Sequence, residues 1–315
     1  MFDYSLELLL QQVANGVARG GYYALVAVGY TMVYGVLQLI NFAHSDVYML
    51  GAYFTYYPAK WMGYISDQPG QKPPDVPWGV TGLLVLISVA ACAIVGMLIE
   101  RIAYRPLRHA GRLAPLITAI GVSLFLEFGG QVAFGADPKP FPKFMDNEAS
   151  VQIGSVGIAQ TKIAIVIVTA VMMTGLWLFV QTTKPGRAIR AISHDVKTAS
   201  LMGINVGRTI SLTFALGSMM AAVGGILVAM DQPRLNPLMG LRIGLKAFVA
   251  AVLGGIGSIP GAALGGLLLG VSESVVGGIK GWGTTYQEAV AFVFLIGVLL
   301  VRPSGLLGKT GREKV

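Results

Sequence analysis

Apolar residues form long, almost unbroken runs along this 315-residue chain. Several runs reach the roughly 20 residues that an α-helix needs to cross a hydrocarbon core about 30 Å thick. A β-barrel would instead show alternating segments of about ten residues. The pattern predicts an all-α integral membrane protein, a polytopic bundle of about nine transmembrane helices within a range of eight to ten. The predicted segments are residues 20–40, 46–65, 79–100, 113–135, 161–181, 209–230, 246–256, 261–277 and 287–301.

Two regions of this pattern allow more than one structure. Residues 5–18 fit either an additional crossing or a helix lying at the membrane interface. Residues 246–277 contain short, glycine-rich elements that fit re-entrant segments, and Pro260 with its flanking glycines predicts a helix break.

Composition agrees with a membrane protein. The chain is 54% hydrophobic and 12% charged, whereas soluble domains carry about 25% charged residues. Residues 1–315 are expected to form one membrane domain, and the single cysteine allows no internal disulfide. The net charge of +8 lies in short loops, which indicates membrane orientation and not nucleic-acid binding.

Basic residues are unevenly distributed among those loops. Segments 101–112, 184–208 and 302–315 hold thirteen lysines and arginines, and the opposite loops hold nine. The positive-inside rule therefore predicts a cytoplasmic C-terminus and, with nine spans, an N-terminus on the outer side. The proline-rich loops 66–78 and 136–160 are expected to cap the outer face. The thirteen residues are Arg101, Arg105, Arg108, Arg112, Lys184, Arg187, Arg190, Lys197, Arg208, Arg302, Lys309, Arg312 and Lys314.

Glycine is abundant, with 42 residues. Helices in lipid associate through close backbone approach, so small residues at helical spacing predict helix packing, or alternatively the lining of a path. The glycines expected to pack are Gly257, Gly261, Gly265, Gly266 and Gly270.

The stretch "KPGRAIRAISHDVKTASLMGIN" concentrates charge between two apolar runs. Wound as one helix, it aligns Ile192, Val196, Ala199 and Gly203 in a narrow stripe. A membrane-surface helix would favour larger apolar residues. The small residues indicate a helix that inserts into a groove of a partner protein.

The sequence offers no catalytic, cofactor or metal site. "GKT" at 308–310 lacks the preceding glycine of a P-loop, since Pro303 takes that place. His44, His109 and His194 form no metal-ligand spacing, and no nucleophile elbow occurs. Two acidic residues, Glu127 and Glu273, fall within predicted spans, where such groups are costly and are candidates for function or for a structural pair.

Several motifs in register resemble one transporter family. They are "YGVLQLINFAHSDVYMLGAYF", "RPLRHAGRLAPLITAIGVSLFLE", "GRAIRAISHDVKTASLMGINVGRTISLTFALGSMMAAVGGIL", "AFVAAVLGGIGSIPGAALGGLLLGVSES" and "VRPSGLLG". This order is similar to the permease subunits of bacterial ABC importers for branched-chain amino acids. One position departs from the family pattern, because Ser45 follows His44 where the family has glycine.

The resemblance implies a bacterial inner-membrane permease that is not itself an enzyme. Its expected partners are a second, similar permease, two ATP-binding subunits that hold ATP and Mg²⁺, and a periplasmic substrate-binding protein. Residues implied in ATPase coupling are Gly186, Arg187, Ala191, Asp195, Ala199, Leu201 and Gly203. Residues expected along the translocation pathway are Asn41, His44, Thr118, Ser123 and Glu127.

Three alternatives remain open from the sequence. A carrier driven by protons or sodium would use intramembrane acids and broken helices. An ABC permease for urea or short amides would share the same motifs. A membrane enzyme or channel would need catalytic or selectivity motifs that the sequence lacks.

Overall fold

A computed structural model describes residues 6–65, 74–107, 113–145, 149–154, 156–281, 283–302 and 304–308. The α-helices in these ranges are α1 (Leu6–Leu37), α2 (His44–Trp61), α3 (Trp78–Ile99), α4 (Leu113–Phe134), α5 (Gln160–Thr182), α6 (Lys184–His194), α7 (Val196–Leu201), α8 (Val206–Asp231), α9 (Met239–Gly254), α10 (Ile259–Gly277), α11 (Gly283–Tyr286) and α12 (Ala289–Val301). A π-helical turn η1 (Glu100–Tyr104) and a 3₁₀ turn η2 (Arg105–Leu107) extend α3. Four short strands pair in two antiparallel ribbons, β1 (Lys139–Pro140) with β4 (Arg234–Leu235) and β2 (Ser150–Ile153) with β3 (Val156–Ala159).

Each of the nine predicted apolar segments coincides with a helix, so the predicted all-α bundle is confirmed. Among the described residues, six helices are long and apolar enough to cross a bilayer. These are α1, α3 with its extension, α4, α5, α8 and α10. The remaining three segments correspond to the shorter helices α2, α9 and α12, of 18, 16 and 13 residues.

Residues 6–18 form neither a separate crossing nor an isolated interfacial helix. They continue into α1, which is one helix of 32 residues and therefore about 48 Å long. Polar side chains in this first part, such as Gln12, are held by neighbours within the protein: Ser274 Oγ donates to Gln12 Oε1 at 3.0 Å.

Helices α1 and α8 form the centre of the bundle. In each, 83% of the apolar window is buried, against 22% in α4 and in α5. Helix α1 packs against α10, α8, α9 and α5, and α8 packs against α1, α3 and α2. The outer helices therefore present apolar side chains to the lipid, and the central helices present theirs to protein.

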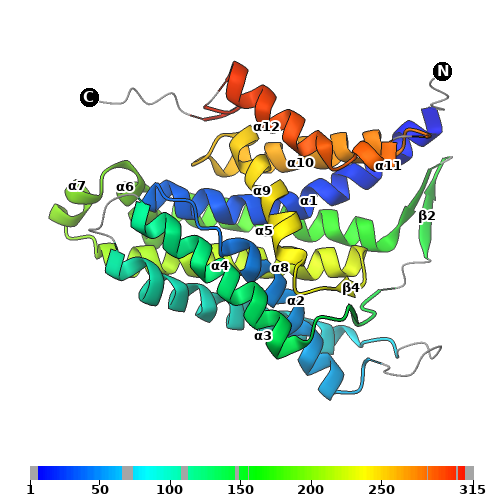
Figure 1. Cartoon of the computed structure of the whole chain (residues 1–315), viewed down its shortest axis with the longest axis horizontal. Coiled ribbons are helices and arrows are strands. Elements are labelled where there is room, and N and C mark those ends of the chain that lie inside the picture. The colour runs from blue at the N-terminus through cyan, green and yellow to red at the C-terminus, as the bar shows by residue number, and fades with distance from the viewer. Residues whose placement is uncertain are drawn as a thin grey trace.

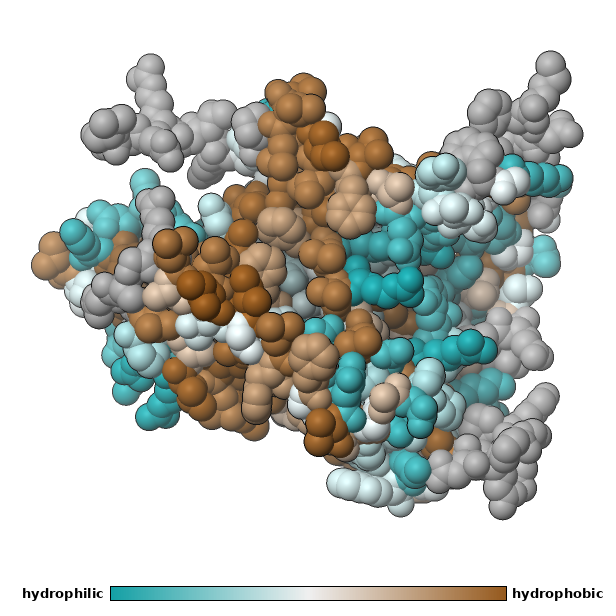
Figure 2. All heavy atoms as spheres, viewed as in Figure 1, coloured by the Kyte–Doolittle hydropathy of each residue, from teal (hydrophilic) through white to brown (hydrophobic). Residues whose placement is uncertain are grey.

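The bundle has two distinct ends (Figure 1). The β2–β3 ribbon lies at one end, here called the hairpin end, and α6 and α7 lie at the opposite end. Figure 2 shows a broad hydrophobic band over the middle of the molecule and hydrophilic residues toward both ends. This distribution is the one expected for a bundle that spans a bilayer.

The predicted helix break separates α9 from α10. Gly255 and Gly257 adopt φ values of 105° and 97°, which favour glycine. The Ser258 hydroxyl then caps α10 by accepting the Gly261 N–H at 3.1 Å. Backbone N–H groups of Leu306 and Leu307 donate to the carbonyls of Leu253 and Gly254, each at 2.9 Å, so the freed end of α9 is satisfied within the protein.

Small residues let α10 pack closely on two neighbours. A Cβ at Gly266 would lie 2.6 Å from Ala24 Cα, and one at Gly270 would lie 2.7 Å from the Gly16 carbonyl oxygen. Gly261 and Gly265 face the backbone of α9 at Gly254 and Ala250. The expectation for Gly257 is wrong, because this residue lies in the turn before α10 with open space around it.

Candidate functional site

The charged stretch 184–205 forms two helices instead of the single helix expected. Helix α6 ends at His194, and Asp195 takes an extended conformation with φ −156° and ψ 113°. Asp195 Oδ1 accepts the backbone N–H groups of Lys197 at 2.8 Å and Thr198 at 3.2 Å. An acidic N-cap of this kind starts a new helix, and the continuous apolar stripe gave no sign of it.

The apolar side of this α6–α7 segment (residues 184–201) packs on the protein itself. Ile189, Ile192 and Ala199 are buried, and Gly186 lies so close to Phe179 and Val180 that a side chain would collide with their backbone. The expected stripe is therefore split, since Val196 is 41% exposed. The buried residues Ile189, Ile192 and Ala199 hold the segment against the bundle, so only other, exposed residues of the segment are available to contact a partner protein.

Exposed apolar side chains gather at the end of α7. Leu201 is 87% exposed and Met202 is 79% exposed. Gly203 follows with a φ of 81°, and the N–H groups of Gly203 and Ile204 close the helix by donating to Ser200 and Ala199. Of the other expected coupling residues, Arg187 and Asp195 are exposed and Ala191 is half-buried. The segment thus ends in a small apolar knob, Leu201–Met202, on a capped base, and Val196 is exposed separately at the start of α7.

The Asp195 cap gives a pH-dependent prediction. The hydrogen bond from the Thr198 hydroxyl, at 2.6 Å, and the two backbone N–H groups hold the pKa of Asp195 below its usual 3.8. A lowered pKa in the folded state means that the cap stabilises α7 above pH 3.8 and that this contribution is lost as the pH falls through the lowered value.

We expect Asp195→Ala to increase hydrogen exchange of the amides of residues 196–202, while Asp195→Asn preserves protection because Asn caps equally well. Protection in the Asn variant should not depend on pH below 3.8 once intrinsic exchange is corrected. Equal exchange in the Ala variant and the unmodified protein would show that packing of Ala199 alone holds α7.

Two expected pathway residues lie in packed interior near the start of α2. Asn41 is 4% exposed, and its Oδ1 accepts the Tyr104 hydroxyl at 2.9 Å. His44 is 1% exposed and its ring lies 4.9 Å from the Tyr30 ring. These contacts hold α1, η1 and the start of α2 together, so the bundle is tightly packed at Asn41 and His44.

The other three expected pathway residues lie on α4. Ser123 Oγ donates to Asp46 Oδ2 at 2.5 Å, and Glu127 is buried one helical turn further along α4. Thr118 is half-buried on the same helix. The structure therefore joins Ser123 to Asp46, an acidic residue in the first turn of α2 that sequence reasoning did not select although it belongs to the "INFAHSD" motif.

An open cleft of about 490 Å³ lies toward the hairpin end and is lined by residues of α1, α8, α9 and the 284–288 region. Its wall holds a buried ion pair: Lys246 Nζ lies 2.5 Å from Glu273 Oε1. The Tyr23 hydroxyl donates to Glu273 Oε2 at 2.7 Å, and the Lys246 ammonium lies 5.9 Å from the centre of the Tyr23 ring. This hairpin-end cleft thus combines paired charges with aromatic surface.

Further polar groups continue from the cleft into the bundle. Arg19 and Gln287 line both the cleft and a neighbouring polar cavity of about 150 Å³. At the C-terminal end of α8, Asp231 accepts the Tyr22 hydroxyl at 3.4 Å. Hydropathy placed the first span from residue 20 and the seventh from residue 246, so Arg19 and Lys246 were left at segment edges and missed. The signal available in the sequence was a basic residue directly at the edge of a long apolar run.

No group of three His, Cys, Asp or Glu side chains within the described ranges could hold a metal ion. His109 and the basic residues Arg108, Arg112, Lys309, Arg312 and Lys314 lie outside those ranges, as do residues 66–73 of one predicted outer loop.

Comparison with known proteins gives a consistent result over nearly the whole chain. Residues 12–299 match a family model described as "Branched-chain amino acid transport system / permease component". The chain is 45% identical to the high-affinity branched-chain amino acid transport system permease protein BraD of Pseudomonas aeruginosa, over 97% of this chain and 98% of BraD. It is 43% identical to LivH of Escherichia coli K12, over 97% of each protein. A probable branched-chain amino acid transport permease protein of Methanocaldococcus jannaschii is 30% identical over 90% of this chain.

Proposed function

Because the chain belongs to the family of permease components of branched-chain amino acid transport systems, we propose that it forms part of the path by which leucine, isoleucine or valine crosses the membrane. The resemblance drawn from the sequence is confirmed, and the chain is a multi-pass transport subunit, not an enzyme. In this proposal, separate subunits hydrolyse ATP and bind its Mg²⁺. The single observation that supports it most is the physical link between the α6–α7 segment and the hairpin-end cleft.

Helix α8 provides that link. It begins at Val206, directly after the segment, and ends at Asp231 beside the cleft. Its 26 residues span about 39 Å as one helix. Helix α6 also packs on α1 and α5, and α1 contributes Arg19, Tyr22 and Tyr23 to the cleft. A push on the segment would therefore tilt the helices that line the cleft.

The Leu201–Met202 knob is the proposed contact for an ATP-binding subunit. Apolar side chains so exposed on a hydrophilic end of the molecule indicate a protein partner. Buried Ile189, Ile192 and Ala199 hold the knob firmly against the bundle, so movement of a partner would not be absorbed by a loose loop. Exposed Arg187 would add only about 0–1 kcal/mol by pairing with an acidic rim.

We assign the α6–α7 end to the cytoplasm and the hairpin end to the outer side, as the distribution of lysine and arginine favours. The C-terminus is then cytoplasmic and the N-terminus periplasmic in a bacterial inner membrane. The open hairpin-end cleft and the closed packing at Asn41 and His44 correspond to an outward-facing state. Asn41, His44, Thr118, Ser123 and Glu127 would line the path when the inner end opens.

The remaining partners follow from the same scheme. A periplasmic substrate-binding protein would deliver the amino acid to the hairpin end, and a second, homologous permease, in a heterodimer, would complete the path. Two ATP-binding subunits would then drive the pair. Family membership supports a transport system of several components, and their number and pairing belong to the proposal.

Uptake by reconstituted vesicles tests the proposal. We expect the chain, purified with its partner subunits, to accumulate radiolabelled leucine only when ATP is supplied. Leu201→Asp should lower this uptake about 30-fold, the effect of losing a contact worth about 2 kcal/mol. Since Leu201 is 87% exposed, the variant should fold and melt like the unmodified protein.

Met62→Asp is the matched control, because Met62 is also an exposed apolar residue but ends α2 at the hairpin side. It should leave ATP-driven uptake unchanged. Leucine accumulation without ATP or without ATP-binding subunits would overturn the proposed mechanism. Normal uptake by Leu201→Asp would remove the knob as the contact.

A further inference from the structure

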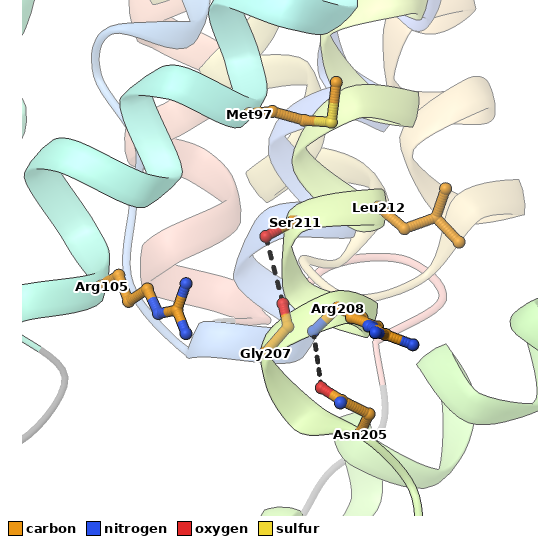
Figure 3. Close-up of a pocket in the computed structure, with 7 residues that line it drawn as sticks. All are labelled: Met97, Arg105, Asn205, Gly207, Arg208, Ser211 and Leu212. Atoms are coloured by element: carbon orange, nitrogen blue, oxygen red, sulfur yellow. Dashed lines mark hydrogen bonds between the residues drawn. The ribbon is translucent and has the colours of Figure 1, made fainter.

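A second pocket, unrelated to the cleft, lies between α3 and α8 near the α6–α7 end (Figure 3). Its volume is about 410 Å³. The lining residues are Met97, Arg105, Asn205, Gly207, Arg208, Ser211 and Leu212. None of them belongs to the proposed knob or to the expected pathway residues.

The pocket has a basic part and an apolar part. Arg105 and Arg208 are exposed, and neither guanidinium has a carboxylate partner among the side chains that the structure describes. Figure 3 shows Arg105 reaching from η2 toward α8, while the Arg208 side chain points away from Arg105 on the opposite side of the α8 ribbon; both residues line the pocket. Met97 and Leu212 lie further along the helices, toward the middle of the bundle.

Other polar groups in the pocket are already engaged. The Ser211 hydroxyl donates to the buried Glu100 carboxylate at 2.5 Å, and Asn205 Oδ1 accepts the backbone N–H of Arg208 at 3.0 Å. A ligand would therefore meet two arginine side chains that have no carboxylate partner within the described ranges, and two positive charges select an anion. Near Met97 along α3 and its η1 extension, Ile94, Leu98 and Ile102 are 54%, 47% and 71% exposed, so these elements present apolar side chains suited to lipid.

We propose that this pocket binds the headgroup of an anionic phospholipid, with its negative charge attracted by the Arg105 and Arg208 guanidinium groups that line the pocket and its acyl chain along Met97 and Leu212. The pocket has basic residues at one end and apolar residues at the other. This arrangement favours a lipid over a free anion, since only a lipid carries an apolar tail next to its charge. An arginine that contacts an anionic headgroup contributes about fivefold in affinity. This site does not depend on the transported solute.

Photo-crosslinking in vesicles tests the site with the full chain in its native assembly. The vesicles contain phosphatidylethanolamine with a small fraction of phosphatidylglycerol, or of phosphatidylcholine, that carries a photoreactive acyl chain. We expect phosphatidylglycerol to label peptides containing Met97 or Leu212 about tenfold more than phosphatidylcholine does. Arg105→Gln and Arg208→Gln should each reduce this preference about fivefold, and Arg105→Lys should largely retain it.

Arg101→Gln is the control for net charge, because Arg101 is exposed on η1 and does not line the pocket. It should leave the labelling ratio unchanged. Equal labelling by both lipids, or no labelling because a second permease covers the face, would overturn the proposal. Complete competition by millimolar inorganic phosphate would also overturn it, since the ligand would then be a free anion.

Discussion

Lys246→Met should lower the free energy of unfolding by about 3–5 kcal/mol, the cost of leaving one charge of a buried pair without its partner. Glu273 is fully buried, and Lys246 lies 2.5 Å from it. The Tyr23 hydroxyl would remain as a donor to Glu273, but a neutral donor compensates a carboxylate only in part. We expect a clearly lower melting temperature in detergent.

The double variant Lys246→Met with Glu273→Gln should recover most of the loss, because it removes both charges and leaves Gln able to pair with Tyr23. Arg242→Met is the control on the same helix. Arg242 and Glu288 lie 3.3 Å apart with side chains 75% and 59% exposed, so that exposed pair should contribute about 0–1 kcal/mol. A double variant as unstable as the single one would mean that Lys246 acts through packing and not through Glu273.

Gly270→Leu should prevent stable folding, with a cost of about 3 kcal/mol or more. The added side chain would enter the backbone of α1 at Gly20 and Gly16. Neither helix can yield there, because a Cβ at Gly20 would in turn lie 2.7 Å from Leu267 Cα and 2.8 Å from the Gly266 oxygen. The expected result is loss of monodisperse protein on size-exclusion chromatography.

Gly175→Leu separates this effect from the general consequences of replacing a glycine. Gly175 lies on α5, and a Cβ atom at this position would meet no neighbouring segment within 4 Å. Leu favours helix by somewhat less than about 1 kcal/mol over Gly, so this variant should melt at the same temperature or slightly higher. Normal folding of Gly270→Leu would show that α1 and α10 can separate without loss of the bundle.

Sequence reasoning located the helices well because length and hydropathy decide them in a membrane protein. Each predicted apolar segment became a helix, and the break before Pro260 appeared between Gly255 and Ser258. The misplaced residue is Gly257, whose four-residue spacing from Gly261 matched the helix although its φ of 97° belongs to a turn. Glycines at four-residue intervals do not by themselves show at which residue a helix begins.

The site was harder to predict, since it depends on contacts between distant segments. The small residues at 186 and 199 suggested a face for a partner, but the bundle itself occupies that face. Leu201 and Met202 are exposed at the end of α7, where Gly203 closes the helix. Glu273 was selected as a buried acid, but its partner Lys246 lies in a different helix, and no local pattern connects them.

The close backbone packing of α1 against α10 also limits which substitutions this protein can accept during evolution. Every single-nucleotide missense change in a glycine codon introduces a residue with a Cβ atom. At Gly20, Gly266 and Gly270 that atom would meet the main chain of the neighbouring helix. New solute preferences would therefore have to arise through substitutions at other positions, such as those that line the cleft, while these three glycines are retained.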